Sequence, residues 1–338
     1  MRRVVLVVLL LAPPCACGGL AASTAVGPGD DAGLDAAAEA LRDGPPAARD
    51  AARDAADGRA SRDASEASTD AARDADDDPI LVKLAVIGDY GSGSPRELTV
   101  ANLVMSWAPE LIVTVGDNDY GTPHQYDAWT GQYFHAFIAP YAGAYGAGAA
   151  VNAFFPVLGN HDWDGDDAAQ YLDFFTLPGN ERYYELDRGP LHLDFLDSDA
   201  REPDGITPDS VQGLWAQAAL AASAAPFQLV VFHHPAYTSG GATPAMDWPF
   251  EAWGANAVLT GHIHNYERLR SADGLDYFVV GQGGFSTSPY GAIHPASKVR
   301  YNVNDGAQLV EVGARHARFR YYDVSGTLVD DFVLQAKP

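Results

Sequence analysis

The sequence predicts an α/β protein in which two packed β-sheets are flanked by helices. Two observations support this fold class. Apolar, β-branched segments alternate with helical segments in the first half of the folded region, whereas strands joined as hairpins dominate the second half. Several of these apolar segments are also followed directly by a glycine and then by polar residues. This is typical of buried strands in α/β folds, whose functional groups lie at the carboxyl ends of the strands.

The chain divides by composition into a leader, an acidic segment and a folded domain, with expected boundaries 1–19, 20–79 and 80–338. In the leader, Arg2 and Arg3 precede an apolar stretch, 4–12, that resembles a secretory signal and is shorter than the about 20 residues of a membrane-spanning helix. Cys17 follows a small residue and precedes two glycines, which looks like a bacterial lipoprotein processing site. We expect an exported protein, periplasmic, cell-surface or secreted, either lipid-anchored through Cys17 or cleaved without a lipid.

Residues 20–79 are expected to form a disordered acidic tether. From residue 30 to 79 the chain has fifteen acidic and six basic residues and lacks aromatic side chains. Such a segment buries too little apolar surface to offset the entropy cost of ordering it. All aromatic residues lie in 80–338, which can therefore form a large core, and both cysteines lie before it, so a disulfide or thiolate site is excluded there.

In the first half of the folded domain, runs of β-branched residues predict strands, and the segments between them that alternate polar and apolar residues with a helical period predict helices. One helix is expected to begin beside Pro95, and another at Asp209, which is a plausible N-cap. The strands expected here are 81–87, 111–115, 154–158, 182–186 and 191–196, and the helices are 96–107, 125–137, 168–175 and 209–222.

In the second half, strands predominate. Two buried strands are expected to end in histidine clusters, and four more complete a β-rich C-terminal region. The expected strands are 227–232, 257–260, 277–280, 307–312, 317–322 and 328–334.

Five of the predicted strands end in residues that commonly bind metal ions. These residues are Asp89, then Asp117 with Tyr120, Asn160 with His161, His233 with His234, and His262 with His264. A single histidine after a strand is usually a surface or capping residue, but five such clusters in succession are hard to obtain by chance. Carboxylate and imidazole donors without thiolates favour hard and borderline metals.

The individual donors suggest separate roles. Asp117 supplies two oxygens and could bridge two metal ions, while Tyr120, three residues further on, could return a phenolate to the same place. Asn160 is a neutral oxygen donor of the kind found at Zn, Mn or Mg sites. Gly261 removes a side chain where the backbone must pass close to the centre.

Taken together, these segments resemble the calcineurin-like metallophosphoesterases, whose five motifs read GD-x-G, GD-x-x-Y, GNH-[DE], V-x-x-H and GH-x-H. In this chain they stand, in the same order, at 88–91, 116–120, 159–162, 230–233 and 261–264. The resemblance covers about residues 80–335 and implies the α/β-β/α sandwich of that family.

Within that family, the chain resembles the purple acid phosphatases of the short, tartrate-resistant type. The first motif lacks the histidine that most metallophosphoesterases carry, and Tyr120 supplies a hard anionic donor instead. The resemblance implies Fe(III) at Asp89, Tyr120 and His264, and a divalent Fe, Zn or Mn ion at Asn160, His233 and His262, bridged by Asp117. It also implies hydrolysis of phosphate monoesters by a metal-activated hydroxide.

The remaining histidines suggest candidates for proton transfer. His161 is adjacent to a ligand and is expected to contact the phosphoryl group and protonate the leaving group, or else to orient a ligand. His234 is a second catalytic candidate, with a supporting position as its alternative. His124, near Tyr120, could be recruited instead, although a surface position is expected for it. His135, His192, His294 and His316 show no ligand context in the sequence.

The expected substrate is a small phosphate ester. A net charge of −24 argues against nucleic acid as a partner, and the only membrane contact expected is the N-terminal lipid. Two alternatives remain open at this point: a phosphodiesterase or nucleotide pyrophosphatase that uses the same site, and a surface binding protein that keeps the metals without turnover.

Overall fold

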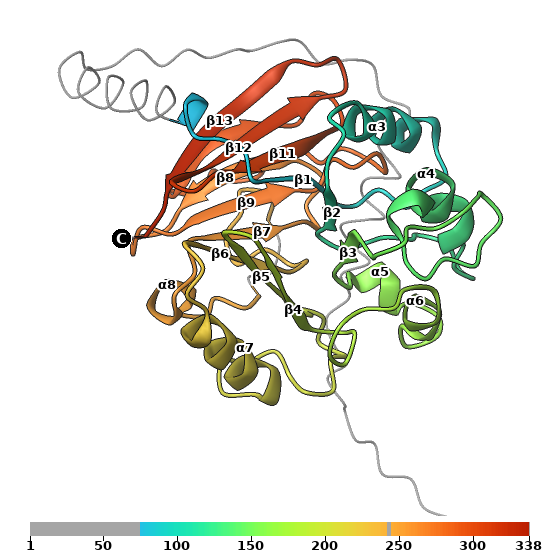
Figure 1. The fold of residues 1–338 in the computed structure, drawn as a ribbon, viewed down its shortest axis with the longest axis horizontal. Coiled ribbons are helices and arrows are strands. Elements are labelled where there is room, and N and C mark those ends of the chain that lie inside the picture. Colours follow the sequence, from blue (N-terminus) through green and yellow to red (C-terminus); the bar gives the residue numbers. More distant parts are fainter. Residues whose placement is uncertain (1–74, 242–244, 338) are drawn as a thin grey trace, which may run out of the picture. The chain divides into compact units, whose positions relative to one another are not determined.

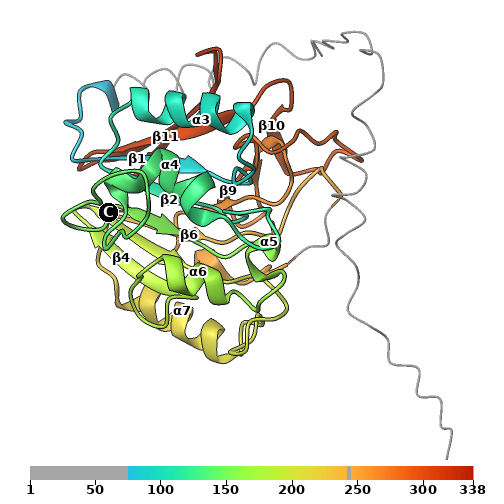
Figure 2. The ribbon, with the colours of Figure 1, turned by 90° about the vertical axis from the view of Figure 1, so that its right-hand side faces the viewer.

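The computed structural model describes residues 75–241 and 245–337. Two β-sheets stack face to face in it, with helices on their outer faces (Figures 1 and 2). In Figure 2, helix α3 lies above the sheets and helix α7 below them. The predicted fold class, two packed sheets flanked by helices, is therefore confirmed.

The first sheet has six strands in the order β13-β12-β11-β1-β2-β3. Its strands β1 (Val82–Ile87), β2 (Leu111–Thr114) and β3 (Phe154–Pro156) are parallel. Strands β11 (Gly306–Val312), β12 (His316–Asp323) and β13 (Leu328–Gln335) continue the sheet in antiparallel fashion. Helix α3 (Pro95–Ser106) makes the crossover from β1 to β2 and begins at Ser94, whose hydroxyl accepts the N–H of Glu97.

The second sheet has seven strands in the order β10-β8-β9-β7-β6-β5-β4. They are β4 (Tyr184–Arg188), β5 (Leu191–Phe195), β6 (Phe227–Val231), β7 (Ala257–Thr260), β8 (Tyr266–Arg270), β9 (Asp276–Val280) and β10 (Ser297–Tyr301). Strands β5, β6, β7 and β9 are parallel to one another. Helix α7 (Val211–Ala222) connects β5 to β6, and the short helix α8 (Phe250–Trp253) precedes β7.

The other helices lie in the two connections that lead from β2 to β3 and from β3 to β4. A short π-helix, η1 (Asp127–Gly131), leads into α4 (Gln132–Phe134) and the 3₁₀ helix η2 (His135–Phe137). Helices α5 (Asn160–Trp163) and α6 (Ala169–Phe174) follow β3. Within the described residues, the helices are all too short or too polar to cross a membrane.

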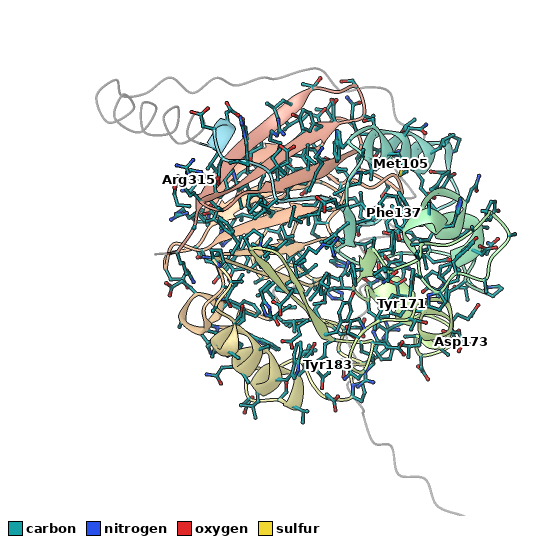
Figure 3. The ribbon with its side chains drawn as sticks, in the orientation of Figure 1. Met105, Phe137, Tyr171, Asp173, Tyr183 and Arg315 are labelled. Atoms are coloured by element: carbon teal, nitrogen blue, oxygen red, sulfur yellow. The ribbon has the colours of Figure 1, made fainter. Side chains whose placement is uncertain are left out.

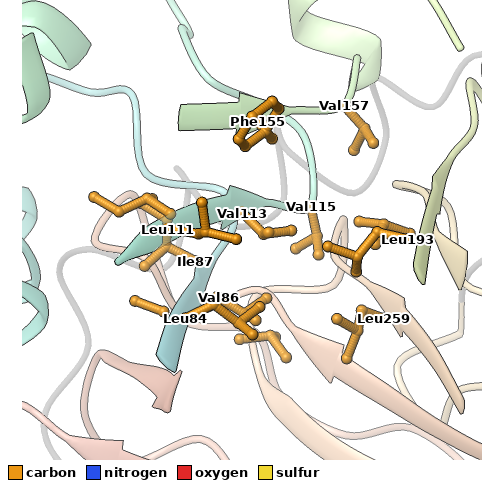
Figure 4. Close-up of a cluster of buried hydrophobic side chains, with 14 of the residues drawn as sticks. Leu84, Val86, Ile87, Leu111, Val113, Val115, Phe155, Val157, Leu193 and Leu259 are labelled. Atoms are coloured by element: carbon orange, nitrogen blue, oxygen red, sulfur yellow. The ribbon is translucent and has the colours of Figure 1, made fainter. Parts of the chain in front are cut away.

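The main core lies between the two sheets. Leu84, Val113 and Val157 on the first sheet meet Leu193 and Leu259 on the second, as Figure 4 shows, and all five are completely or almost completely buried. Each buried aliphatic side chain of this size contributes about 1.5–3 kcal/mol relative to its exposed state. The same contacts bring the ends of β1, β2 and β3 next to the ends of β6 and β7.

Most predicted elements are present, and the differences have local causes. The helix at 209–222 begins at Ser210, whose hydroxyl accepts the N–H of Gly213, so the expectation that Asp209 is the cap was wrong. The helix expected at 125–137 is divided into three short pieces of different pitch. Strands β8 and β10 were not predicted because charged residues interrupt both, three of the five residues in β8 and two of the five in β10.

Residues just before the expected domain boundary at 80 also belong to the folded region. One carboxylate oxygen of the buried Asp78 accepts the backbone N–H groups of Arg315 (2.7 Å) and His316 (2.9 Å), at the turn between β11 and β12. Asp76 pairs with Arg318 on β12. The predicted signal peptide, lipid site and most of the predicted tether lie outside the described residues.

Candidate metal centre

The residues expected to bind metal ions all follow the carboxyl ends of parallel strands. Asp89 follows β1, Asp117 and Tyr120 follow β2, Asn160 follows β3, and the three histidines of the last two motifs follow β6 and β7. Asp89, Asp117 and His262 have positive φ angles of 56°, 53° and 66°. The chain therefore turns sharply just after β1, β2 and β7, where these three side chains begin the loops that carry the candidate ligands.

One group of three donors contains the tyrosine. The hydroxyl of Tyr120 lies 3.2 Å from Nε2 of His264 and 3.4 Å from Oδ1 of Asp89. The same His264 nitrogen is 3.4 Å from Oδ1 of Asp89. A phenol, a carboxylate and an imidazole therefore converge on one point, and all three are hard or borderline donors.

A second group of three donors surrounds the side chain of Asn160. Its Oδ1 lies 3.1 Å from Nε2 of His233 and 3.0 Å from Nδ1 of His262. An amide oxygen and two imidazoles form a neutral donor set, which suits a divalent ion. His233 and Asn160 are buried.

Asp117 lies between these two groups. Its Oδ2 is 3.3 Å from Nε2 of His233, and ligand atoms of Asp89, Asp117 and His233 lie within 4.8 Å of one another. The other oxygen, Oδ1, accepts the backbone N–H of His161 at 3.0 Å. The carboxylate thus contacts the second group through His233 and lies within 4.8 Å of a ligand atom of Asp89 in the first.

Glycines allow the chain segments to approach one another here. A Cβ atom on Gly261 would lie 2.6 Å from Oδ2 of Asp89 and 2.7 Å from the carbonyl oxygen of Val115. Gly116 has a φ of +95°, and a Cβ there would lie 2.4 Å from Nδ1 of His233. Both contacts are closer than real Cβ atoms approach, so side chains at these positions would push the ligands apart.

Hydrogen bonds behind the cluster fix the orientation of two imidazoles. Nδ1 of His233 donates to the carbonyl oxygen of Val115 at 2.7 Å, which leaves Nε2 as the nitrogen that faces Asn160 and Asp117. Nδ1 of His264 contacts the hydroxyl of Ser286. Such partners hold a histidine in the tautomer and orientation that a metal ion requires.

The electrostatics of the cluster favour an ionised Asp117. Burial raises its pKa, but the attraction of His233, His161 and His262 outweighs burial and places the pKa well below the usual range. Burial has the opposite consequence for His234, where it lowers the pKa of the imidazole to about 3. His234 is therefore a neutral group, and its Nδ1 lies 2.9 Å from the hydroxyl of Ser198.

His161 lies beside the tyrosine, on the first turn of α5. Its ring centroid is 4.4 Å from that of Tyr120, and Phe285 stacks on Tyr120 with a centroid distance of 3.7 Å. Nδ1 of His161 is 3.4 Å from Oδ2 of Asp164, and the guanidinium of Arg201 donates to Asp164 at 2.9 Å. A histidine, a carboxylate and an arginine thus form a chain of contacts next to the donor groups.

Several of these neighbours were not identified from the sequence. Arg201 also donates to both oxygens of Asp199 and to the backbone oxygen of Asn160 at 2.8 Å, so it connects the loop after β5 to the metal-binding loop. Arg201, Ser198, Phe285 and Ser286 reach the centre from loops distant in sequence. Only the spacing of Asp164, three residues after His161 on a short helix, offered a local signal.

The other histidines differ in position. His124 is 9% exposed and lies with Nδ1 3.5 Å from Oδ1 of Asp119, so the expectation that it is a surface residue was wrong. His192 lies next to carboxylates on the second sheet, a context that the sequence did not reveal. His135 contacts a backbone oxygen, and His316 lies 3.5 Å from Asp78, both away from the donor cluster.

Residues 82–266, more than half of the chain, match the family model described as calcineurin-like phosphoesterase. The chain belongs to the calcineurin-like phosphoesterase family. Tartrate-resistant acid phosphatase type 5 of Rattus norvegicus is 24% identical over 307 residues, which cover 76% of this chain and 91% of that protein. Purple acid phosphatase 3 of Arabidopsis thaliana is 24% identical over 280 residues, which cover 72% of this chain and 75% of that protein.

Solved structures show the same fold. Purple acid phosphatase PPD1 from yellow lupin seeds has a TM-score of 0.62 at 17% identity, covering 75% of this phosphoesterase and 53% of that chain. GAP50, the anchor in the inner membrane complex of Plasmodium, has a TM-score of 0.58 at 17% identity, covering 77% and 90%. The predicted resemblance to purple acid phosphatases and the prediction of a phosphate-ester hydrolase are confirmed. Proteins described as a phosphatase and as an anchor share this fold. The specific function must therefore be argued from the residues of the site and not from the fold.

Proposed function

We propose that this phosphoesterase is a binuclear-metal acid phosphatase that hydrolyses phosphate monoesters. Asp89, Tyr120 and His264 would hold Fe(III), and Asp117 would bridge it to a second ion. The observation that carries the proposal is the contact of the Tyr120 hydroxyl with Nε2 of His264 at 3.2 Å and with Oδ1 of Asp89 at 3.4 Å. A phenolate in that position supplies the hard anionic donor that the first motif lacks.

A divalent Fe, Zn or Mn ion would occupy the second donor group, Asn160, His233 and His262. The donors fit this assignment because the group is neutral, apart from its share of Asp117, and contains the nitrogen ligands that borderline ions prefer. When bound, two such ions lower the pKa of water and neutralise the charge of a phosphoryl group.

The protein's own side chains would bind and protonate the ester. Arg201 is a cation beside the donor cluster, with its side chain 40% exposed, and it would attract a phosphate anion to this otherwise acidic protein. His161 would act as the general acid, because its contact with Asp164 orients the ring beside the donor groups.

His234 is the weaker candidate for proton transfer. Burial lowers its pKa to about 3, so its ring is a neutral imidazole near neutral or moderately acidic pH and lacks the acidic proton of an imidazolium. Its ligand atom lies within 4.8 Å of those of His233 and His262. We propose that its role is to position the second donor group, with the Ser198 hydroxyl fixing its ring.

The test combines colour, metal content and hydrolysis. The purified full chain should contain two metal ions per molecule, after subtraction of the metal found in a control protein treated with the same chelator. It should also show a visible charge-transfer band from the phenolate. Tyr120→Phe should lose the band while the far-UV circular dichroism stays unchanged, and Tyr90→Phe, a buried tyrosine of the first motif, is the matched control. A band that persists in Tyr120→Phe would contradict the proposal.

Substrate class is tested separately on the same preparation. The proposal expects kcat/KM for a nitrophenyl monoester to exceed that for the bis-nitrophenyl diester. A preference for the diester would make the protein a phosphodiesterase, and metal-replete protein that hydrolyses neither ester would make it a binding protein.

A further inference from the structure

The outer face of the hairpin β4–β5 carries four ionisable side chains, although this hairpin contributes no residue to the centre described above. In the antiparallel register, Glu185 pairs with Asp194, and Asp187 pairs with His192. Because side chains alternate along a strand, these four residues lie on one face, while Leu191, Leu193 and Phe195 point into the core between the sheets.

Two of these side chains are buried without the partners that burial normally requires. Asp194 is 0% exposed and His192 is 3% exposed. Among the residues that the structure describes, neither carboxylate oxygen of Asp194 accepts a well-formed hydrogen bond, and the nearest contact of Nε2 of His192 is Oδ2 of Asp194 at 3.4 Å. Buried carboxylates in folded proteins are almost always satisfied, so Asp194, with one oxygen unbonded and the other in a long contact, has room for a further partner.

The geometry identifies the kind of partner. Glu185, His192 and Asp194 each offer one ligand atom, and these atoms lie within 4.8 Å of one another. Nε2 of His192 is 3.4 Å from Oδ2 of Asp194, while Nδ1 of the same ring contacts Oδ1 of Asp187 at 2.7 Å. That second contact keeps a proton on Nδ1, in the arrangement that second carboxylates give to metal-binding histidines. Burial lowers the pKa of His192, but Asp194 and Asp187 outweigh burial and raise this pKa to about 9, so a metal ion would bind at Nε2 by displacing its proton.

The surroundings close one side of this group and leave the other open. Tyr183, which precedes β4, packs against Trp215 of α7 with a ring-centroid distance of 5.0 Å, and Figure 3 shows Tyr183 on the α7 side of the molecule. The side chains of Asp187 and Glu185 are exposed on the other side. An ion could therefore enter from solvent and keep water as its remaining ligands.

We propose that Glu185, His192 and Asp194 form a further divalent-cation site, separate from the phosphoesterase centre, with Asp187 as the residue that positions His192. One imidazole and two carboxylates favour Zn²⁺ or Mn²⁺ over soft ions. The ion would join β4, the edge strand of the second sheet, to β5, and it would provide the positive charge that the three carboxylates of this face lack.

The experiment measures bound Zn²⁺ per chain after equilibration with Zn²⁺ and removal of the excess, using the full chain. His192→Gln is expected to bind one equivalent less than the wild type. His135→Gln, a histidine away from this hairpin, is the matched control and should bind the wild-type amount. Asp187→Asn should keep the site but weaken it, by about 10- to 100-fold as for other positioning carboxylates.

The comparison is repeated in an Asp117→Asn chain, in which the phosphoesterase centre is weakened. The loss of one equivalent with His192→Gln should be the same in this background, which separates the two sites. In addition, Zn²⁺ should raise the melting temperature of the Asp117→Asn chain, whose hairpin residues are all wild type. Equal Zn²⁺ content with and without His192, together with an unchanged melting temperature, would overturn the proposal and leave a protonated His192 paired with Asp194.

Discussion

At the scale of single residues, the centre depends on side chains that have contacts in two directions. Asp117 contacts His233 through one oxygen and the backbone N–H of His161 through the other. His161 in turn lies between the ring of Tyr120 and the carboxylate of Asp164. A change at either residue therefore alters more than one contact, and the predictions below separate these effects.

Asp117→Asn should reduce the content of both metal ions. Asparagine tolerates the φ of +53° at this position, so the backbone is preserved, but a neutral amide is a poor bridge between two cations. We expect less than half of the wild-type content of each ion by elemental analysis, with unchanged circular dichroism. Normal content of both ions would remove Asp117 from the bridging role.

His161→Ala should keep both ions and lose activity unevenly. A general acid contributes about 10²–10⁴-fold, and it is needed most where the leaving group is a poor one. The loss of kcat/KM should thus be much larger for an alkyl phosphate than for a nitrophenyl phosphate. Asp164→Asn is the matched variant for the orienting carboxylate and should show the same pattern with a smaller loss. Equal losses for both esters in His161→Ala would reduce this residue to a phosphate contact.

At the scale of elements, turns at the strand ends are held by buried carboxylates. Oδ1 of Asp162 accepts the backbone N–H of Asn118 (3.1 Å) and the hydroxyl of Tyr126 (2.9 Å), while Oδ2 accepts the N–H of Gly159 (2.8 Å). This side chain therefore ties the loop after β2 to the loop after β3. Glu97 performs a similar task at the start of α3, where its Oε2 accepts the N–H groups of Ser92 (3.1 Å) and Gly93 (2.7 Å).

Glu97 should make the stability of the fold depend on pH. Burial raises the pKa of Glu97 to about 8, against 4.5 for the free side chain. Between these values the unfolded chain has lost the proton that the folded chain retains, so the free energy of unfolding falls as pH rises, by at most about 1.4 kcal/mol per pH unit. Below pH 4.5 the contribution is complete, and above pH 8 it has been lost.

The measurement is the free energy of unfolding in urea at pH 5, 6, 7 and 8, for the wild type and Glu97→Gln. The Glu97→Gln chain lacks this pH-dependent contribution. The difference between its free energy of unfolding and that of the wild type should therefore change in favour of the variant from pH 5 to pH 8. Glu110→Gln, the same exchange at an exposed position, provides the control. Parallel pH profiles of the wild type and Glu97→Gln would show that Glu97 is already ionised in the folded state.

At the scale of the whole molecule, the centre exists only where the two sheets meet. The first sheet supplies four donors, Asp89, Asp117, Tyr120 and Asn160, and the second supplies His233, His262 and His264. The C-terminal hairpins add a further connection, because the turn between β11 and β12 is bonded to Asp78 at the start of the folded region.

A chain that begins at residue 75 should be as stable as the full chain, and a chain that begins at residue 81 should be less stable. The shorter chain leaves the N–H groups of Arg315 and His316 without the carboxylate of Asp78, and each buried unpaired donor costs about 1–3 kcal/mol. Asp78→Ala in the longer chain should reproduce most of the loss, as measured by urea unfolding. A loss of stability in the chain from residue 75 would instead show that the predicted tether packs on the domain.

The sequence was sufficient for the fold class and for finding seven candidate ligands that the structure brings together, because motifs that directly follow apolar strands are local signals. It was insufficient where the signal is a contact across the sheet or between loops. Leu191–Phe195 reads as an apolar strand with two polar interruptions, and only the pairing with β4 shows that His192 and Asp194 share a face with two more carboxylates. Arg201 and Phe285 reach the centre from loops without a motif of their own, so a single sequence offers no means of finding them.

The division of the donors between two sheets determines when the protein can acquire its metals. Synthesis delivers Asp89 through Asn160 first, but these side chains form only part of each donor group until His264, more than a hundred residues later, has been made and the second sheet has docked. Because binding would then favour only the docked state, metals bound there would stabilise the contact between the sheets, and a chelator should promote their separation. If the chain is exported unfolded, this order places metal acquisition after transport, so the ions available outside the cytoplasm would decide which metals the finished enzyme contains.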